Sequence, residues 1–465
     1  MAQSHYEWVF GEIGDRLDTV SFVNRVRDET SRPRVSVKDW QILKKSQRRI
    51  PSIAADVLDV TMAIQFADWL SYPNPKGEQR VIEIAIPVRH PEKFDDPIIR
   101  AQLQTVLYWE TGDHWLFRFK KRKSIGRFTE LQNTMWPTSG NADELEVALF
   151  SGGLDSMAGL CQRLTRYPQK QFVLFSLGSN NNRLRAKQEY LARRISERSG
   201  RVRLVSVDFQ RRKDSRGTNS LFRARGFAFL MAGAANALIE QQNVLYIYEN
   251  GIGAFNLPFR LSEVGVDHSR AVHPLSLLYA GQLISSLFET EFSFVNPFLY
   301  STKAEMCTAL VNASWLDLIL ETVTCDRLWP QSVQCGYCSS CLLRRQALAY
   351  LGIEDKTPYR TTLAQSAEDL SRMWEKSHFY HMRHQAETLG VDLDSPDPWQ
   401  KLSRRFPSLL SDTVHRICRA TGESPELMIA EILDLYGRYV HEWDTARDLI
   451  APELQFDDMD LRRAG

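Results

Sequence analysis

The sequence lacks an apolar run near the ~18 residues that a membrane-spanning helix needs. Its N-terminus, Met-Ala-Gln-Ser-His-Tyr-Glu, has neither the basic patch nor the apolar core of a secretory signal, so we expect a soluble, cytoplasmic protein. The chain has 58 Lys and Arg and 57 Asp and Glu, so neither positive nor negative charge is in excess. That balance argues against a nucleic-acid partner, since duplex binding usually needs a basic excess. Internal repeats and low-complexity tracts are absent as well.

Cysteine is scarce, with seven residues in 465, yet four of the seven are clustered. This distribution fits a metal site in a reducing cytosol better than a disulfide framework. The composition, 43% hydrophobic and 25% charged, is that of an ordinary globular protein. The length predicts two to four domains with ample chain for a core.

The most informative segment reads Ser-Gly-Gly-Leu-Asp-Ser at 151–156. It follows the apolar run 147–150, and apolar residues at 157, 160, 161 and 164 then fall on one helical face. The predicted context is strand, glycine turn and helix N-terminus, which suits phosphate, because glycines let backbone N–H groups close around an anion and the helix dipole favours negative charge. It is not a Walker A loop, whose Gly-Lys-Ser/Thr ending is missing. A tight turn with serine as a helix cap is the simpler alternative.

This segment resembles the PP-loop of the ATP pyrophosphatases, whose signature is Ser-Gly-Gly-x-Asp-Ser. The resemblance implies that ATP is cleaved between its α and β phosphates, that AMP is transferred to a substrate oxygen, and that the loop holds pyrophosphate. The implied ATP contacts in the loop are Ser151, Gly152, Gly153, Leu154, Asp155 and Ser156. Asp155, being acidic, is expected to cap backbone N–H groups or to help hold Mg²⁺. Magnesium is expected because the departing pyrophosphate must be neutralised.

The cysteine cluster is the second informative feature. Cys325, Cys335, Cys338 and Cys341 have the spacing Cys-x9-Cys-x2-Cys-x2-Cys. Four thiolates are what a closed tetrahedral Zn²⁺ site requires, so we expect structural zinc. An iron–sulfur cluster is the main alternative, because close cysteine runs also bind clusters, but the usual fourth cysteine followed by proline is missing. Reactive dithiols are a third possibility.

The order of these motifs, with Thr302-Lys303-Ala304-Glu305 between them and Arg344 after them, resembles 7-cyano-7-deazaguanine synthase, the QueC family. The resemblance spans roughly 146–350. It implies a parallel-sheet, HUP-like nucleotide-binding core, structural zinc, and adenylation of a 7-deazaguanine-type carboxylate followed by amide and nitrile formation.

Departures from the QueC pattern are also clear. The chain adds long segments at both ends, and it reads Ser-Leu-Gly-Ser-Asn at 176–180 where the synthases carry Asp-Tyr-Gly-Gln. At 222–226 it reads Phe-Arg-Ala-Arg-Gly in place of Pro-Gly-Arg-Asn. The chain instead resembles the enlarged QueC-like proteins of bacterial antiphage systems, Qat and type IV CBASS, in its Glu249-Asn250-Gly251 turn, its His273-Pro274 pair and Asn296-Pro297-Phe298 before Thr302. That resemblance implies transfer of the activated carboxylate to a partner protein in a defence complex.

The remaining site residues are assigned by position. By the family's layout Ser176 and Leu177 flank the adenine, and Lys303 stabilises the α-phosphate, with a solvated lysine at a helix start as the alternative. Arginine forks suit phosphate or carboxylate, so Arg223 and Arg225 are catalytic candidates, unless they are surface residues at a helix start. Glu249 and Asn250 lie at the end of a predicted strand. Their carboxylate and amide groups suit hydrogen bonding to a flat substrate base, or else they cap a turn.

The fold class expected is α/β. Strand-like runs at 146–150, 172–176, 202–207 and 244–248 alternate with helix-like runs at 155–166, 184–198 and 221–240, which predicts a parallel sheet. We expect a separate N-terminal α+β domain at 1–142, with antiparallel strands at 81–88 and 114–119 and with either a helix or two short strands at 56–69. The core then covers 143–353 after a boundary turn at 137–141, and a helical region covers 354–465. Within that region 425–446 shows helical spacing, with apolar residues at 428, 432, 435 and 439 on one stripe. The basic run at 118–123 is expected to be solvated.

The resemblance to these families thus implies an ATP-dependent ligase that forms a C–N bond and releases AMP and pyrophosphate. The acceptor is ammonia or a protein amine. Two alternatives remain: a PP-loop enzyme that transfers sulfur to tRNA, and a non-catalytic nucleotide-binding subunit of a defence complex.

Overall fold

A computed structural model describes residues 4–9, 18–24, 29–31, 34–46, 48–71, 79–123, 130, 144–178, 182–211, 223–259, 270–326, 333–360 and 373–450. The predicted boundary turn at 137–141, Ser179, Asn180 and Phe222 lie outside these residues. Contacts along the chain define two compact units. Unit 1 comprises Met1–Ser151, Arg166–Tyr248 and Gly265–Pro297; unit 2 comprises Gly152–Thr165, Glu249–Val264 and Phe298–Gly465. The units cut across the predicted domain limits at 142 and 353.

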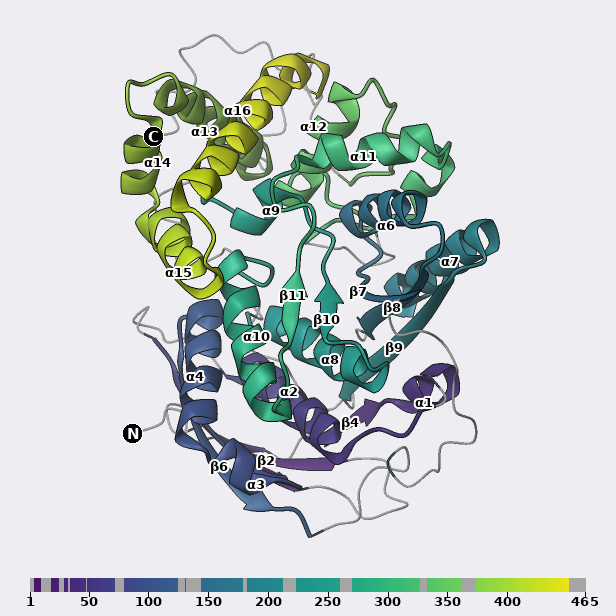
Figure 1. Cartoon of the computed structure of the whole chain (residues 1–465), viewed down its shortest axis with the longest axis vertical. Coiled ribbons are helices and arrows are strands. Elements are labelled where there is room, and N and C mark those ends of the chain that lie inside the picture. Colours follow the sequence, from purple (N-terminus) through teal and green to yellow (C-terminus); the bar gives the residue numbers. More distant parts are fainter. Residues whose placement is uncertain are drawn as a thin grey trace. The chain divides into compact units, whose positions relative to one another are not determined.

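Unit 1 contains one mixed sheet with the strand order β11-β10-β7-β8-β9-β4-β2-β1-β5-β6, and β3 pairs with β2 (Figure 1). Its strands are β1 (Ser4–Val9), β2 (Asp18–Asn24), β3 (Glu29–Ser31), β4 (Arg34–Lys38), β5 (Val81–Val88), β6 (His114–Lys121), β7 (Leu145–Leu149), β8 (Gln171–Gly178), β9 (Val202–Arg211), β10 (Val244–Tyr246) and β11 (Ser293–Val295). The run β11-β10-β7-β8-β9 is parallel throughout, so the predicted α/β class is confirmed.

The helices of unit 1 are α1 (Trp40–Ser46), α2 (Ser52–Leu70), α3 (Pro91–Phe94), α4 (Pro97–Thr111), α7 (Asn182–Ser199), α8 (Arg225–Ile239) and α10 (Pro274–Phe288). α8 packs on β7 and β8, and α2 packs on α8 and β5. The Ala- and Gly-rich α8 is buried over most of its surface, as its nearly uniform apolar sequence predicts. The core of unit 1 therefore runs continuously beneath the parallel and the N-terminal strands.

The N-terminal strands match the expected antiparallel pairing only in part, since β2 pairs antiparallel with β1, β3 and β4. β5 and β6 occupy the predicted runs but pair in parallel, and β1 also pairs in parallel with β5. β4 pairs antiparallel with β9 and so joins these strands to the parallel sheet. The ambiguous segment at 56–69 is helical, within α2. Strand patterning in the sequence indicates that a strand exists but does not specify its partner, which explains the error.

Arginines pair with buried aspartates in unit 1. Arg80 contacts Asp68 and Asp113, each at 2.5 Å. In a second cluster, Arg89 and Arg122 share Asp59, each at 2.7 Å, and Arg89 also binds Asp56 and Glu130. The prediction that the basic run 118–123 is solvated is thus wrong for Arg122, whose side chain is 7% exposed, although Arg118 is 57% exposed.

Unit 2 is helical in its described residues. Its helices are α6 (Leu154–Arg166, whose last residue is counted in unit 1), α9 (Gly251–Phe255), α11 (Lys303–Asn312), the 3-10 helix η3 (Leu316–Glu321), α12 (Ser339–Tyr350), α13 (Met373–Leu393), α14 (Pro398–Arg405), the π-helical turn η6 (Pro407–Ser411), α15 (Asp412–Thr421) and α16 (Pro425–Ile450). The long α16, yellow in Figure 1, packs against α12 and α13. Its buried residues at 428, 432, 435 and 439 confirm the predicted apolar stripe.

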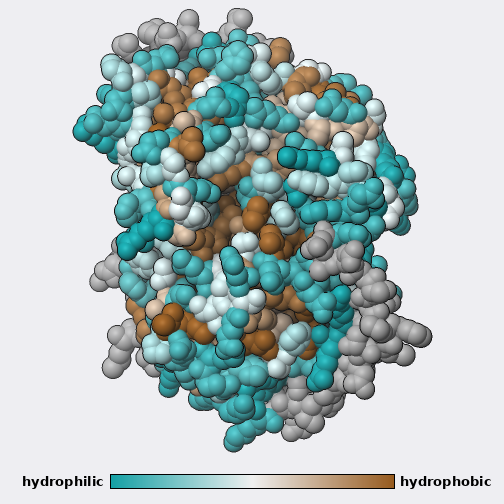
Figure 2. Space-filling model, in the orientation of Figure 1, coloured by the Kyte–Doolittle hydropathy of each residue, from teal (hydrophilic) through white to brown (hydrophobic). Residues whose placement is uncertain are grey.

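Polar residues predominate on the face in Figure 2, with hydrophobic residues in scattered groups. None of the helices that the structure describes is long and apolar enough to cross a membrane.

Candidate functional site

The glycine turn has the predicted local structure. β7 ends at Leu149, and α6 begins at Leu154. Gly152 has a φ of +75°, a conformation that favours glycine over residues with a Cβ. The Gly152 carbonyl accepts a hydrogen bond from Val323 N at 2.9 Å. Ser151 is exposed, whereas residues 152–156 are buried.

Ser151 and Ser176 meet a common partner in unit 1. Gln188 Nε2 donates to the Ser151 carbonyl at 2.6 Å, and Ser176 Oγ donates to Gln188 Oε1 at 3.2 Å. Leu177 is buried at the end of β8. The sequence reasoning missed Gln188, because one glutamine in a charged helix carries no pattern that marks it. The structure therefore brings two of the predicted serines together through a side chain that was not predicted.

A buried charge network in unit 2 joins three predicted residues. Lys303 Nζ forms an ion pair and a short hydrogen bond with Asp155 Oδ2. The other oxygen, Asp155 Oδ1, accepts from Asn250 Nδ2 at 3.1 Å. Asp155 is 6% exposed and Lys303 is 4% exposed. The alternative that Lys303 is a solvated lysine at a helix start is therefore wrong.

Glu249 extends this network. Its Oε1 accepts from Asn250 Nδ2 at 2.8 Å. Burial and the nearby Asp155 carboxylate raise the pKa of Glu249 to about 8. Burial alone would lower the pKa of Lys303, but the Asp155 and Glu249 carboxylates outweigh burial and raise it. The network thus keeps a protonated lysine beside a carboxyl group that can change its protonation state near neutral pH.

Asn250 is a helix cap. Its Oδ1 accepts from Gly253 N at 2.9 Å at the start of α9. The capped-turn alternative is therefore confirmed. Its assigned contact with a substrate base stays a prediction.

The two candidate arginines lie in unit 1. Arg223 is half-buried, and its Nη1 donates to the Thr111 carbonyl at 2.8 Å. Arg225 is exposed at the start of α8, and its guanidinium lies 5.5 Å from the centre of the Phe229 ring. Arg223 thus stabilises the C-terminal end of α4 in this structure. A catalytic role for either residue stays a prediction.

The four clustered cysteines converge. The sulfur atoms of Cys325, Cys335, Cys338 and Cys341 all lie within 4.8 Å of one another. Backbone N–H groups of Cys335 and Cys338 donate to the sulfurs of Cys325 and Cys335 at 3.2 and 3.3 Å. Hydrogen bonds from the neighbouring thiols lower the pKa of Cys335, which favours a thiolate. This donor set can hold one metal ion.

A short segment links the cysteine cluster to the glycine turn. Residues 322–324 directly precede Cys325, and Val323 bonds to Gly152. The fully buried Arg344 donates to Thr322 Oγ1, and Gln334 accepts from Thr324 N at 2.9 Å. These contacts fix the segment from both sides. Arg344 follows the cysteine motif in the sequence, but no sequence pattern marks Gln334 or the threonines.

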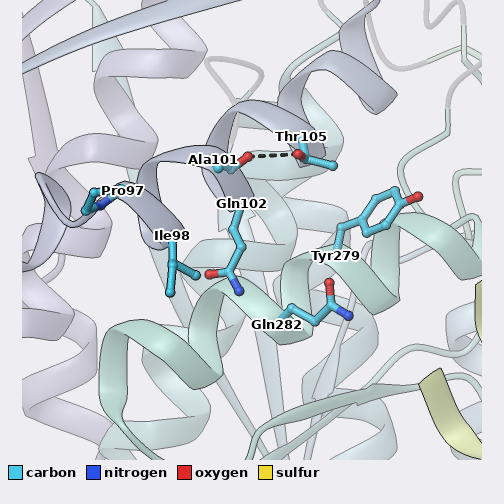
Figure 3. Close-up of a pocket in the computed structure, with 7 residues that line it drawn as sticks. All are labelled: Pro97, Ile98, Ala101, Gln102, Thr105, Tyr279 and Gln282. Carbon is cyan, nitrogen blue, oxygen red and sulfur yellow. Dashed lines mark hydrogen bonds between the residues drawn. The ribbon is translucent and has the colours of Figure 1, made fainter.

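A groove of about 390 Å³ lies elsewhere, between α4 and α10 of unit 1 (Figure 3). Its lining consists of Pro97, Ile98, Ala101, Gln102, Thr105, Tyr279 and Gln282. None of these residues belongs to the predicted site.

No protein-family model matches the chain.

Proposed function

We propose that the protein is an ATP-dependent ligase of QueC-like, PP-loop type. An oxygen of a 7-deazaguanine-type carboxylate attacks the α-phosphate of ATP, the bond between the α and β phosphates breaks, and pyrophosphate leaves. An amine then attacks the acyl carbon of the acyl-adenylate, loses a proton and displaces AMP to form an amide. The acceptor is ammonia, on the way to a nitrile, or an amine of a partner protein in antiphage defence.

One observation supports this proposal above the rest: Lys303 and Asp155 form a buried pair one turn from Gly152 and Gly153. Lys303 provides the positive charge that the pentavalent α-phosphate needs, and a charge fixed before reaction stabilises a transition state most effectively. Asp155 orients Lys303 and offers carboxylate oxygen for Mg²⁺. The adenine contacts of Ser176 and Leu177, and the anion contacts of Arg223 and Arg225, belong to the same proposal.

For the cysteine site we propose structural zinc. A tetrahedral Zn²⁺ with bonds of about 2.3 Å separates its sulfurs by about 3.8 Å. Cys335 Sγ and Cys341 Sγ are 3.9 Å apart, and Cys338 Sγ and Cys325 Sγ are 4.0 Å apart. A four-iron cluster binds each cysteine through a different iron, which requires wider spacing. Equimolar zinc without a visible absorption band supports this assignment.

The test is pyrophosphate release by the full chain with ATP, Mg²⁺ and 7-carboxy-7-deazaguanine, with ammonium or co-expressed proteins as acceptors. Lys303→Met and Asp155→Asn should each reduce the rate by about 10²-fold or more. The matched control is Lys401→Met, which alters an exposed lysine of the same unit and should leave the rate unchanged.

Two results would overturn the proposal. ATP binding without pyrophosphate release, with every acceptor present, favours a non-catalytic subunit. A brown protein with a broad visible band favours sulfur transfer to tRNA.

A further inference from the structure

Lys303 is the first residue of α11, and the residues around it form a complete capping box. Thr302 Oγ1 accepts from Glu305 N at 3.2 Å, and Glu305 Oε2 accepts from Thr302 N at 2.8 Å. A capping box satisfies two backbone donors at once and fixes the first helical turn. The direction in which Lys303 leaves the backbone is therefore set by Thr302 and Glu305.

The C-terminal helix α16 holds both members of that box. Glu442 of α16 accepts a short hydrogen bond from Thr302 Oγ1. One turn earlier on α16, Arg438 forms an ion pair with Glu305 Oε1 at 2.8 Å and donates to the Tyr300 carbonyl at 2.6 Å. One helix, α16, thus contacts Thr302 on one side of Lys303 and Glu305 on the other.

Glu442 is an unusual residue for this position. It is 3% exposed and continues the buried stripe of Leu435, Tyr439 and Trp443. Its second oxygen accepts from Gln346 Nε2 of α12 at 2.8 Å. A buried carboxylate costs folding free energy relative to an apolar residue of similar size. Packing of α16 alone therefore does not account for it.

Helix α16 also supports the other side of the network. Gly251 follows Asn250, and its N–H donates to the Ser301 carbonyl at 2.8 Å. A Cβ on Gly251 would lie 2.1 Å from the Leu299 carbonyl oxygen and 2.5 Å from Leu435 Cδ2 of α16. The turn that carries Asn250, the segment 299–302 and α16 are thus packed together without spare space.

We infer that α16 is a working part of the candidate site, in which Glu442, assisted by Arg438, positions Lys303 against Asp155 through Thr302. The inference rests on the proposed function for the catalytic role of Lys303. The contacts of Glu442 with Thr302 and of Arg438 with Glu305 do not depend on that function. Glu442 is a positioning residue, since it reaches Lys303 only through the cap.

The experiment compares Glu442→Leu, which removes both acceptors, with Glu442→Gln, which keeps an acceptor for Thr302. Asp448→Asn, an exposed acid of the same helix, is the matched control. Two readouts need no activity: mass-spectrometric labelling of Lys303 by an acetylating reagent, and hydrogen exchange of the amides at 303–307. A third is the separation of kcat from KM for ATP.

Glu442→Leu should raise amide exchange at 303–307 and labelling of Lys303 by about tenfold, because the first turn of α11 opens locally. It should lower kcat by about tenfold and leave KM for ATP within about threefold, since a lysine that acts in the transition state is displaced. In Glu442→Gln the changes in exchange, labelling and kcat should be much smaller than in Glu442→Leu. Asp448→Asn should match the natural chain.

Should Glu442→Leu fail to fold, Arg438→Gln provides the second test, with smaller effects in the same direction. Labelling and exchange that stay within twofold in both variants would overturn the inference, as would equal damage from Leu and Gln. A natural chain that releases no pyrophosphate would remove the proposed function, while labelling and exchange would still decide the role of α16.

Discussion

Both units bury charged side chains, but they pair them in different ways. In unit 1 arginines hold the charges: Arg80 joins two aspartates and backbone carbonyls at 68 and 71. Unit 2 also buries an arginine, Arg344, beside Asp355, but next to its glycine turn the paired cation is a lysine, Lys303, which faces Asp155. Arginine is always charged and forms rigid forked contacts, whereas lysine is a compact charge that can change partners. A buried ion pair is thus not by itself the sign of an active site; the residue type and its place at a helix start are more informative.

The two units should differ most in how far their stability depends on bound metal, because the cysteine cluster lies in unit 2. Cys341→Ser should abolish metal binding and unfold the region around the cysteines, because metal binding at such sites contributes on the order of 10 kcal/mol. Metal analysis and hydrogen exchange by peptide check this, with Cys418→Ser, outside the cluster, as the control. Protection lost equally in the β8 and β9 peptides of unit 1 would contradict it.

The arginine clusters of unit 1 should be the next largest contributors. Arg80→Met leaves Asp68 and Asp113 buried without their cation, which should lower the free energy of unfolding by about 3–5 kcal/mol. Arg118→Met removes a 57% exposed arginine of the same unit and should cost about 0.5 kcal/mol or less. Urea unfolding of both variants provides the measurement. Equal losses would show that burial does not determine how much these ion pairs contribute to the free energy of unfolding.

One buried glutamate in each unit gives a comparison by pH. Burial raises the pKa of Glu442 to about 7 and that of Glu110 in α4 well above its ordinary value. The folded state then holds protons that the unfolded chain has released, so each residue lowers stability as pH rises above about 4.5.

Each glutamine variant should remove its share of this slope, which for Glu442 is on the order of 3 kcal/mol. Both benefits should grow as pH rises above about 4.5, and that of Glu442→Gln should stop growing near pH 7. Melting temperatures from pH 5 to 9 test this, and a difference from the natural chain that does not change with pH would refute it.

The smallest effects should come from two mid-helix glycines and should have opposite signs. A Cβ on Gly233 of α8 would lie 2.5 Å from Leu149 Cδ2 and 2.7 Å from Leu245 Cδ2, so Gly233→Ala should destabilise unit 1 by roughly 1–3 kcal/mol. A Cβ on Gly437 of α16 meets nothing within 4 Å, so Gly437→Ala should stabilise unit 2 by about 0.5–1 kcal/mol. Thermal melts of both variants suffice, and a shared sign would refute the packing argument.

Much of the fold could be predicted from the sequence because its signals are local. The runs at 146–150 and 202–207 coincide with β7 and β9 within a few residues, and the helix predicted at 425–446 lies within α16. Partners were not predictable, since pairing of β4 with β9 joins residues 35–38 to 208–211, far apart in the chain.

The candidate site divides in the same way. The glycine turn, the cysteine spacing and the Lys303 motif are short patterns, and the structure brings Lys303, Asp155 and Asn250 together. Glu442 was missed, although a charged residue seven positions after Leu435, on the apolar stripe of α16, was a readable signal. The pairing of Thr302 with Glu442 spans 140 residues, which no local pattern encodes.

The antiparallel pairing of β4 with β9 also has a consequence for how the chain can be divided. A fragment that began at residue 143 would leave the edge of β9 at residues 208–211 as an open row of backbone donors and acceptors, a template on which other molecules can assemble. The N-terminal strands act as a fixed cover for that row. We therefore expect shortened forms of this protein to aggregate if they lack the first strands.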